Sequence, residues 1–163
     1  MLFRSALRAI RWMMGGLDVA GYVPIVAALP FILVAFVAFA MMTRTLNLLS
    51  VGAEAAATRG VEIVGAQRMA FLSASLATGA AVSLGGPIGF IGIIVPHLVR
   101  LMVGADHRIV LPAATLFGAA FLVLCDLAAK TVMAPLEIPV GVVTALIGGP
   151  FFLWLLVKKS DRK

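Results

Sequence analysis

The sequence predicts an all-α protein that crosses a lipid bilayer about five times, and three observations support this fold class. Of the 163 residues, 63% are hydrophobic and only 12% are charged, whereas soluble domains carry about 25% charged residues. Two long stretches, 19–43 and 69–99, contain no Asp, Glu, Lys or Arg. The basic residues gather in the short gaps between apolar runs. A chain of this size could not hide so much apolar surface in its own core, so lipid must solvate much of it.

The first apolar stretch follows three arginines, which are Arg4, Arg8 and Arg11. A secretory signal has an apolar region of only about 7–15 residues, and the uncharged stretch here is longer. We therefore expect residues 1–20 to form an amphipathic segment ahead of a first span at about 22–42. Pro24 and Pro30 lie in this span, and prolines are tolerated in lipid when neighbouring helices satisfy the freed backbone groups.

The uncharged stretch 69–99 is too long for one pass, because as one helix it would reach about 46 Å. Gly85, Gly86 and Pro87 near its middle break a helix. We therefore expect two antiparallel spans, at about 64–84 and 88–103, joined by a tight turn. Small residues allow close packing of such a pair.

Two further spans are expected at about 109–129 and 141–157, separated by a segment with two prolines. With five spans, the basic tail after 157, the turn near Arg108 and the connection 44–62 all fall on one side. That side should be cytoplasmic, because cytoplasmic loops carry an excess of Lys and Arg. The C-terminus is then cytoplasmic and residues 1–20 lie outside, which conflicts with the three arginines in that segment.

The connection 44–62 is polar enough to leave the lipid. Residues 53–58 favour a helix, with Gly52 before them and Gly60 after them. A short surface helix between two spans suits docking into a groove of a soluble partner. The same residues also suit an ordinary cytoplasmic loop, and the residues alone leave both interpretations open.

The segment GGPIGFIGIIVPHLVRLMVGADHR, residues 85–108, is the most unusual of the chain. Pro96 should break the third span near its cytoplasmic end. His97, one turn before Arg100, could act as a proton relay or ligand, but a histidine near a helix end more often bonds free carbonyls. Neither the other histidine, His107, nor a cysteine is spaced to complete a metal site.

Asp126 and Lys130 lie at positions i and i+4 of the fourth span, so they can pair. Glu137, between two prolines, should be accessible outside. The sequence contains no phosphate-binding loop, no nucleophile with a base and no pair of catalytic carboxylates, so we expect no enzyme and no catalytic residue. Two alternative functions use the same residues: an ion-coupled secondary transporter with a relay through Asp126, Lys130 and His97, or a non-transporting membrane anchor subunit.

Five segments, in order along almost the whole chain, carry a family resemblance. They are WMMGGLDVAGY (12–22), LNLLSVGAEAA (46–56), GGPIGFIGIIVPHLVRLMVGADHR (85–108), LPAATLFGAAFLVLCDLAAK (111–130) and EIPVGVVTALIGGPFFLWLL (137–156). Together they resemble the permease subunits (FecCD- and BtuC-like) of ABC importers for iron–siderophore complexes, heme and vitamin B12. The resemblance implies a multi-pass protein of the bacterial plasma (inner) membrane. Its five spans would correspond to helices 6–10 of a ten-helix permease.

The resemblance also implies partners. Such permeases work as dimers, bind two cytoplasmic ABC ATPase subunits and receive substrate from a periplasmic or lipid-anchored binding protein. This chain would then bind no cofactor, and ATP and Mg would be held by the ATPase. The N-terminal half of the family pattern is missing, so we expect a truncated or split subunit that does not transport alone. Iron–chelate transport is the default substrate class.

By position, the resemblance assigns roles to three groups of residues. The ATPase-coupling group is Gly52, Ala53, Glu54, Ala55, Ala56, Arg59 and Gly60. The structural motif is Gly85, Gly86, Gly89, Phe90, Gly92, Pro96, His97 and Arg100. Lys130 falls where the family often has an arginine that pairs with an acidic residue of the binding protein. Lysine keeps the charge but lacks the bidentate fork, and its pairing with Asp126 competes with this role.

Overall fold

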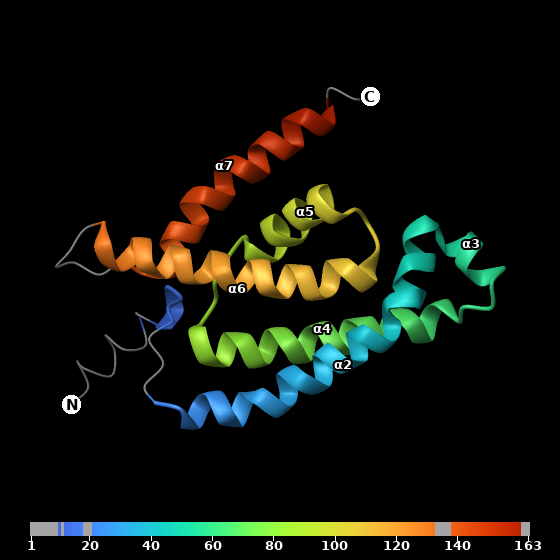
Figure 1. Ribbon diagram of the computed structural model, residues 1–163, viewed down its shortest axis with the longest axis horizontal. Coiled ribbons are helices and arrows are strands. Elements are labelled where there is room, and N and C mark those ends of the chain that lie inside the picture. Colours follow the sequence, from blue (N-terminus) through green and yellow to red (C-terminus); the bar gives the residue numbers. More distant parts are fainter. Residues whose placement is uncertain (1–9, 11, 18–20, 133–137, 161–163) are drawn as a thin grey trace. The chain divides into compact units, whose positions relative to one another are not determined.

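The computed structural model of the chain is all-α in the part that it describes, residues 10, 12–17, 21–132 and 138–160, as the sequence predicted. Figure 1 shows the helices, which are α2 (Val23–Val51), α3 (Ala53–Ala57), α4 (Ile63–Gly85), α5 (Ile91–Val103), α6 (His107–Thr131) and α7 (Val140–Ser160). Most of the segment 1–20, Glu137 and the last three residues lie outside the described part.

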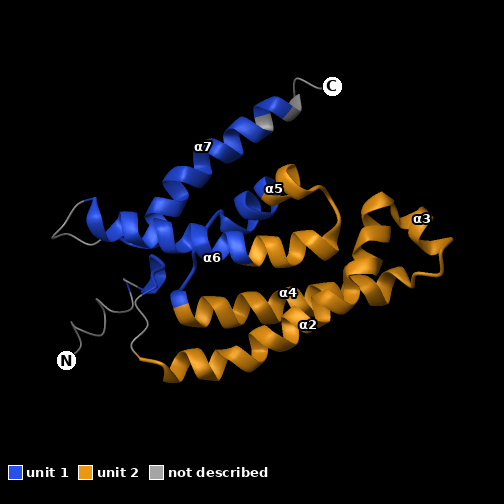
Figure 2. Ribbon diagram, viewed as in Figure 1, with its two compact units in different colours: residues 1–18, 85–98, 116–163 blue, residues 19–84, 99–115 orange. Residues whose placement is uncertain are grey.

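The helices form two compact units, coloured separately in Figure 2. Unit 1 consists of residues 1–18, 85–98 and 116–163, and unit 2 of residues 19–84 and 99–115. Helices α5 and α6 each contribute residues to both units.

Helix α2 has 29 residues and is therefore about 44 Å long, longer than the hydrocarbon layer of about 30 Å. Pro24 stands in its first turn, where no backbone donor is needed. The helix continues through residues 44–51, which were expected in the connection, because this stretch has leucines and no glycine or proline. It ends at Gly52, so only residues 52–62 separate α2 from α4.

Within the described residues, α2 and α6 are the helices both long and apolar enough to cross a membrane. Helix α4 has 23 residues, but its serines, Thr78 and glycines lower its hydropathy. Helix α5 is apolar and has 13 residues, which is about 20 Å and shorter than a full span. Helix α7 is apolar from 140 to 155.

The distribution of side chains is the reverse of that in a soluble protein. Large apolar side chains are exposed, for example Phe71 at 73% and Leu116 at 74%, whereas the fully buried positions include Ala35 and Ala129 at 1%. Small residues let helices approach closely, and large apolar residues are stable against lipid tails. This distribution fits the polytopic membrane fold that the sequence predicts.

The core of unit 1 lies between α6 and α7. Cys125, Ala129 and Val140 are buried together, and Phe121, Leu122, Ile138 and Val143 pack against them. The backbone N–H of Ile138 donates to the carbonyl of Ala129 at 3.3 Å. Cys125 is 3% exposed and free, so it acts as a small buried hydrophobe.

Backbone segments in unit 1 approach one another at glycines. The N–H of Gly16 donates to the carbonyl of Gly85 at 2.8 Å, and the N–H of Gly141 donates to the carbonyl of Gly15 at 3.3 Å. Gly86 has φ +68°, and a Cβ there would collide with the carbonyl oxygen of Trp12. These contacts join the segment 12–16 to the α4–α5 turn and to the first turn of α7.

Pro96 does not break a helix, contrary to expectation, because α5 runs through it from Ile91 to Val103. A proline ring clashes with the carbonyl four residues earlier, which here belongs to Gly92. Gly92 has no side chain, and a Cβ built there would meet nothing within 4 Å. A proline within a membrane helix is tolerated where neighbouring helices or local backbone adjustments satisfy the freed backbone groups.

Phe90, the residue before α5, adopts a left-handed conformation with φ +66°. Its carbonyl accepts hydrogen bonds from the N–H groups of Ile93 and Ile94, both at 3.0 Å. A Cβ at Gly148 of α7 would collide with the Phe90 side chain, so this glycine makes room for the ring. Left-handed phenylalanine costs of the order of 1–3 kcal/mol, and packing against α7 holds it in place.

The substitution Gly86→Ala should destabilise the protein by about 1–2 kcal/mol or more, because a side chain at positive φ is strained and would also meet Trp12. Gly89→Ala is the matched control, since the space around Gly89 is open. Thermal unfolding of the two purified variants in detergent measures the difference. Equal melting temperatures would contradict the close approach of the 12–16 segment.

Candidate functional site

Helix α3 is a short helix between α2 and α4, as the helix-favouring residues between Gly52 and Gly60 predicted. Gly52 has φ +136°, a backbone conformation that residues with a side chain rarely adopt. It turns the chain at the end of α2. Its N–H still donates to the carbonyl of Leu49 at 3.2 Å, and its own carbonyl accepts the N–H of Ala56 at 3.0 Å. The backbone therefore passes from α2 into α3 without a flexible linker.

The other end of α3 is closed by a Schellman motif. The N–H of Val61 donates to the carbonyl of Ala56 at 3.1 Å, and the N–H of Gly60 donates to that of Ala57 at 2.9 Å. Gly60 supplies the left-handed conformation, with φ +80°. One residue after this motif, the Glu62 carboxylate accepts the N–H of Gly65 at 2.7 Å and caps α4.

The outer surface of α3 is open and its inner surface is packed. Ala56 is 0% exposed, and α3 packs against α2. The rest of the coupling group is exposed or half-buried: Gly52, Ala53, Glu54, Ala55, Arg59 and Gly60. A short helix with small side chains and one carboxylate, followed by the Arg59 guanidinium, is therefore exposed on its outer side.

The end of α2 is hydrogen-bonded to the start of α6 through Asn47, the only asparagine of the chain. Its amide Nδ2 donates to Asp106 Oδ1 at 2.6 Å. Its Oδ1 accepts the backbone N–H of His107 at 2.8 Å and contacts Nδ1 of the His107 ring at 2.6 Å. All three residues belong to unit 2.

One assignment of hydrogens satisfies this whole network. Because Asn47 Oδ1 is an acceptor, His107 carries its proton on Nδ1. The other ring nitrogen, Nε2, is then free to accept from Arg100, whose guanidinium nitrogen lies 3.4 Å away. Arg100 is thus brought to the α5–α6 turn.

Asp106 caps α6 from within the turn. Its carboxylate accepts the N–H of Arg108 at 2.9 Å, and its carbonyl accepts the N–H of Val110 at 2.9 Å. The N–H of Arg108, followed by the amide of Asn47, holds the pKa of Asp106 below its ordinary value. The carboxylate therefore stays ionised over the physiological pH range and keeps accepting both bonds.

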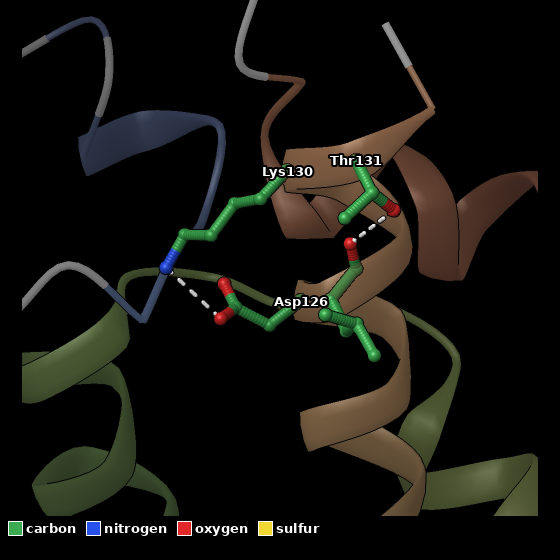
Figure 3. A network of polar contacts seen from close by, with 4 residues as sticks. Asp126, Lys130 and Thr131 are labelled. Atoms are coloured by element: carbon green, nitrogen blue, oxygen red, sulfur yellow. Dashed lines mark hydrogen bonds and ion pairs between the residues drawn. The ribbon is translucent and has the colours of Figure 1, made fainter. Parts of the chain in front are cut away.

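The ion pair predicted on α6 is confirmed and shown in Figure 3. Lys130 Nζ lies 2.9 Å from Asp126 Oδ2, with 43% of the lysine and 21% of the aspartate side chain exposed. The second oxygen of Asp126, Oδ1, is buried without a hydrogen-bond partner among the described residues. The Thr131 hydroxyl beside them donates to the carbonyl of Leu127 at 2.7 Å.

The expectation that His97 bonds free helix-end carbonyls is wrong, because α5 continues to Val103. The half-buried ring instead meets Phe151 of α7 edge-on, with 5.9 Å between ring centroids. Further along α7, Lys158 Nζ lies 4.7 Å from the ring centroid of Trp154, a cation–π contact.

The structural motif is not gathered at one place. Gly85 and Gly86 contact the 12–16 segment, Phe90 packs at Gly148, and His97 packs at Phe151. Sequence reasoning missed three residues. Gly15 and Gly141 bond to each other through their backbones, and Asn47 forms the α2–α6 link. The sequence signal for Asn47 was a single amide in an apolar helix, five residues before Gly52.

The chain belongs to the FecCD transport family, whose model matches residues 2–158. It is therefore an integral membrane protein of an ABC permease family. The match bears out the resemblance carried by the five sequence segments.

Individual relatives agree with this family. The chain is 43% identical to the hemin transport system permease protein of Yersinia pestis over 93% of its own length and 46% of that protein. It is 47% identical to the cobalamin import system permease protein of Halobacterium salinarum, over 98% of this chain and 42% of the relative. The chain spans about half the length of the curated relatives it matches.

A solved structure gives the same fold. An inward-facing metal-chelate type ABC transporter matches with a TM-score of 0.80 and 33% sequence identity, over 91% of this chain and 49% of that one.

Replacing Lys130 by Met should lower the stability of the protein by about 1 kcal/mol, because Asp126 would be left half-buried without its cation. The double variant Asp126→Asn/Lys130→Met should regain most of this loss, since it buries no unpaired charge. Melting temperatures of both variants in detergent test the pair. If the double variant were no more stable than Lys130→Met, the loss would not come from an unpaired Asp126 charge, contrary to this account.

Proposed function

We propose that this chain forms part of the membrane-embedded permease of a binding-protein-dependent ABC importer. The substrate class is a metal chelate of the iron–siderophore, heme or cobalamin kind. Family membership supports the transport role. The relatives named for hemin and cobalamin and the metal-chelate transporter of the same fold support the substrate class.

Helix α3 is the proposed contact for the cytoplasmic ATPase. Its exposure and its hydrogen-bonded ends are the observation that supports this function most. A coupling element must be exposed to its partner and stiffly joined to membrane helices. The open outer surface of α3, the bonds at Gly52 and the Schellman motif at Gly60 meet both requirements. An ordinary mobile loop would need none of these features.

In the proposed topology, α3, the α5–α6 turn and the C-terminus are cytoplasmic. The basic residues of this side, including Arg44, Arg59 and Arg108, are exposed, as anchors at an anionic membrane surface should be. The α4–α5 turn and the end of α6 then face outward. The protein lies in the bacterial plasma membrane as a multi-pass subunit.

Lys130 is the proposed docking residue for the substrate-binding protein on the outer side. Its side chain is 43% exposed, so it can contact a partner carboxylate while Asp126 keeps it oriented. A second permease polypeptide would complete the pathway. ATP and Mg are bound by the ATPase partner, and this chain transmits motion without chemistry of its own.

The charge reversal Glu54→Lys should reduce ATP-driven uptake about tenfold or more, since α3 is the proposed docking surface and a charge that mismatches its partner there costs several kcal/mol. Uptake is measured in proteoliposomes that hold the chain with its ATPase, binding protein and accompanying permease chains. Gln67→Lys is the matched control, because Gln67 is also exposed but lies on α4.

The same preparation separates this function from an ion-coupled transporter. Uptake should stop when ATP is withdrawn while ion gradients are held constant. Normal uptake by the Glu54→Lys variant, or uptake driven by an ion gradient alone, would contradict the proposed function.

A further inference from the structure

We propose that Asn47 is a positioning residue that ties α6 to the base of α3, so that displacement of α3 moves α6. This inference rests on the proposed function, because it takes α3 as the ATPase contact. It assigns a role to a residue that touches neither the ATPase nor the substrate. The argument depends on the contacts within unit 2 alone.

Asn47 caps the start of α6 from another helix. The first N–H groups of a helix have no partner within it, and α6 begins at His107. Asn47 accepts the His107 N–H at 2.8 Å, while Asp106 accepts the Arg108 N–H at 2.9 Å. Asn47 also donates to Asp106 at 2.6 Å, so the two capping side chains are themselves joined.

The hydrogen bonds of Asn47 lie close to α3 and are connected to it by the helical backbone of α2. Asn47 precedes Gly52 by five residues, about 7.5 Å of helix, and the Gly52 N–H remains bonded to Leu49. A displacement of α3 therefore reaches Asn47 through helical backbone. From Asn47 the bonded path continues into the first turn of α6.

The amide is required because it must donate and accept at once. Its donor faces the Asp106 carboxylate, which has acceptors only, and its acceptor faces two His107 nitrogens. An aspartate at position 47 would place two carboxylates together, and a leucine would remove all the bonds. Exchanging the two side chains, as Asn47→Asp/Asp106→Asn, restores one donor facing one acceptor.

The exchange experiment measures substrate transported per ATP hydrolysed in the reconstituted complex. Asn47→Asp should lower this ratio about tenfold, equivalent to losing one or two net hydrogen bonds, while the ATPase still binds. The double variant should return to within about threefold of the unmodified chain, because asparagine is also a good helix cap. Asn47→Leu/Asp106→Asn is the matched control and should not recover.

A second variant covers the case in which Asn47→Asp fails to fold. Asn47→Cys/Asp106→Cys, made in a Cys125→Ala background, is assembled with its partners and closed with a short thiol-reactive bifunctional reagent. The amount of substrate transported per ATP should be low before the two cysteines are crosslinked and should recover after crosslinking. If transport per ATP did not recover after crosslinking, the proposed link would be overturned.

The outcomes separate this inference from the proposed function. If Glu54→Lys abolishes uptake but Asn47→Asp transports normally per ATP, α3 is the coupling element and the Asn47 link is refuted. If Glu54→Lys also transports normally, the proposed function itself fails. A purely structural role for Asn47 would instead lower melting temperature and ATPase binding together, with an unchanged ratio in the complexes that remain.

Discussion

The structure depends on one constraint: hydrocarbon offers no hydrogen-bond partner to a peptide group. Each N–H and carbonyl at membrane depth must therefore be satisfied within its own helix or by a neighbour. This requirement explains the long apolar helices α2 and α6 and the exposed large side chains such as Phe71 and Leu116. It also confines polar side chains with specific partners mainly to the helix ends, where Asn47, Glu62 and Asp106 are found.

Hydrogen bonds between polar side chains determine which helix ends are joined, which contacts between apolar side chains alone do not. Lipid-facing leucines and phenylalanines are interchangeable with one another, but the amide of Asn47 is not, because it serves a carboxylate and two His107 nitrogens. In the same way, Gly60 supplies a backbone conformation that closes α3. The chain therefore holds a fixed projection, α3, at a helix end and a bonded route from it into α6.

Much of the fold could be predicted, because the hydrophobic composition and the long stretches without charged residues directly indicate which segments are solvated by lipid. Gly52 and Gly60 located α3, and the spacing of Asp126 and Lys130 predicted their pair. The contacts of Asn47 with Asp106, and of Gly86 with Trp12, join residues far apart in sequence, and no local periodicity reports them. The prediction at Pro96 was wrong because a proline is tolerated inside a membrane helix when its surroundings satisfy the freed backbone groups, and no local sequence pattern reports those surroundings.

The central claim is that α3 lies on the cytoplasmic side, within reach of a nucleotide-driven partner. It is tested most directly by labelling the assembled membrane protein with a membrane-impermeant maleimide, using Ala55→Cys or Gly89→Cys in a Cys125→Ala background. The account predicts that the cysteine at 55 reacts only in inside-out vesicles and the cysteine at 89 only in right-side-out vesicles. Reaction of the cysteine at 55 from the outer side would contradict it, since no cytoplasmic ATPase could then reach α3.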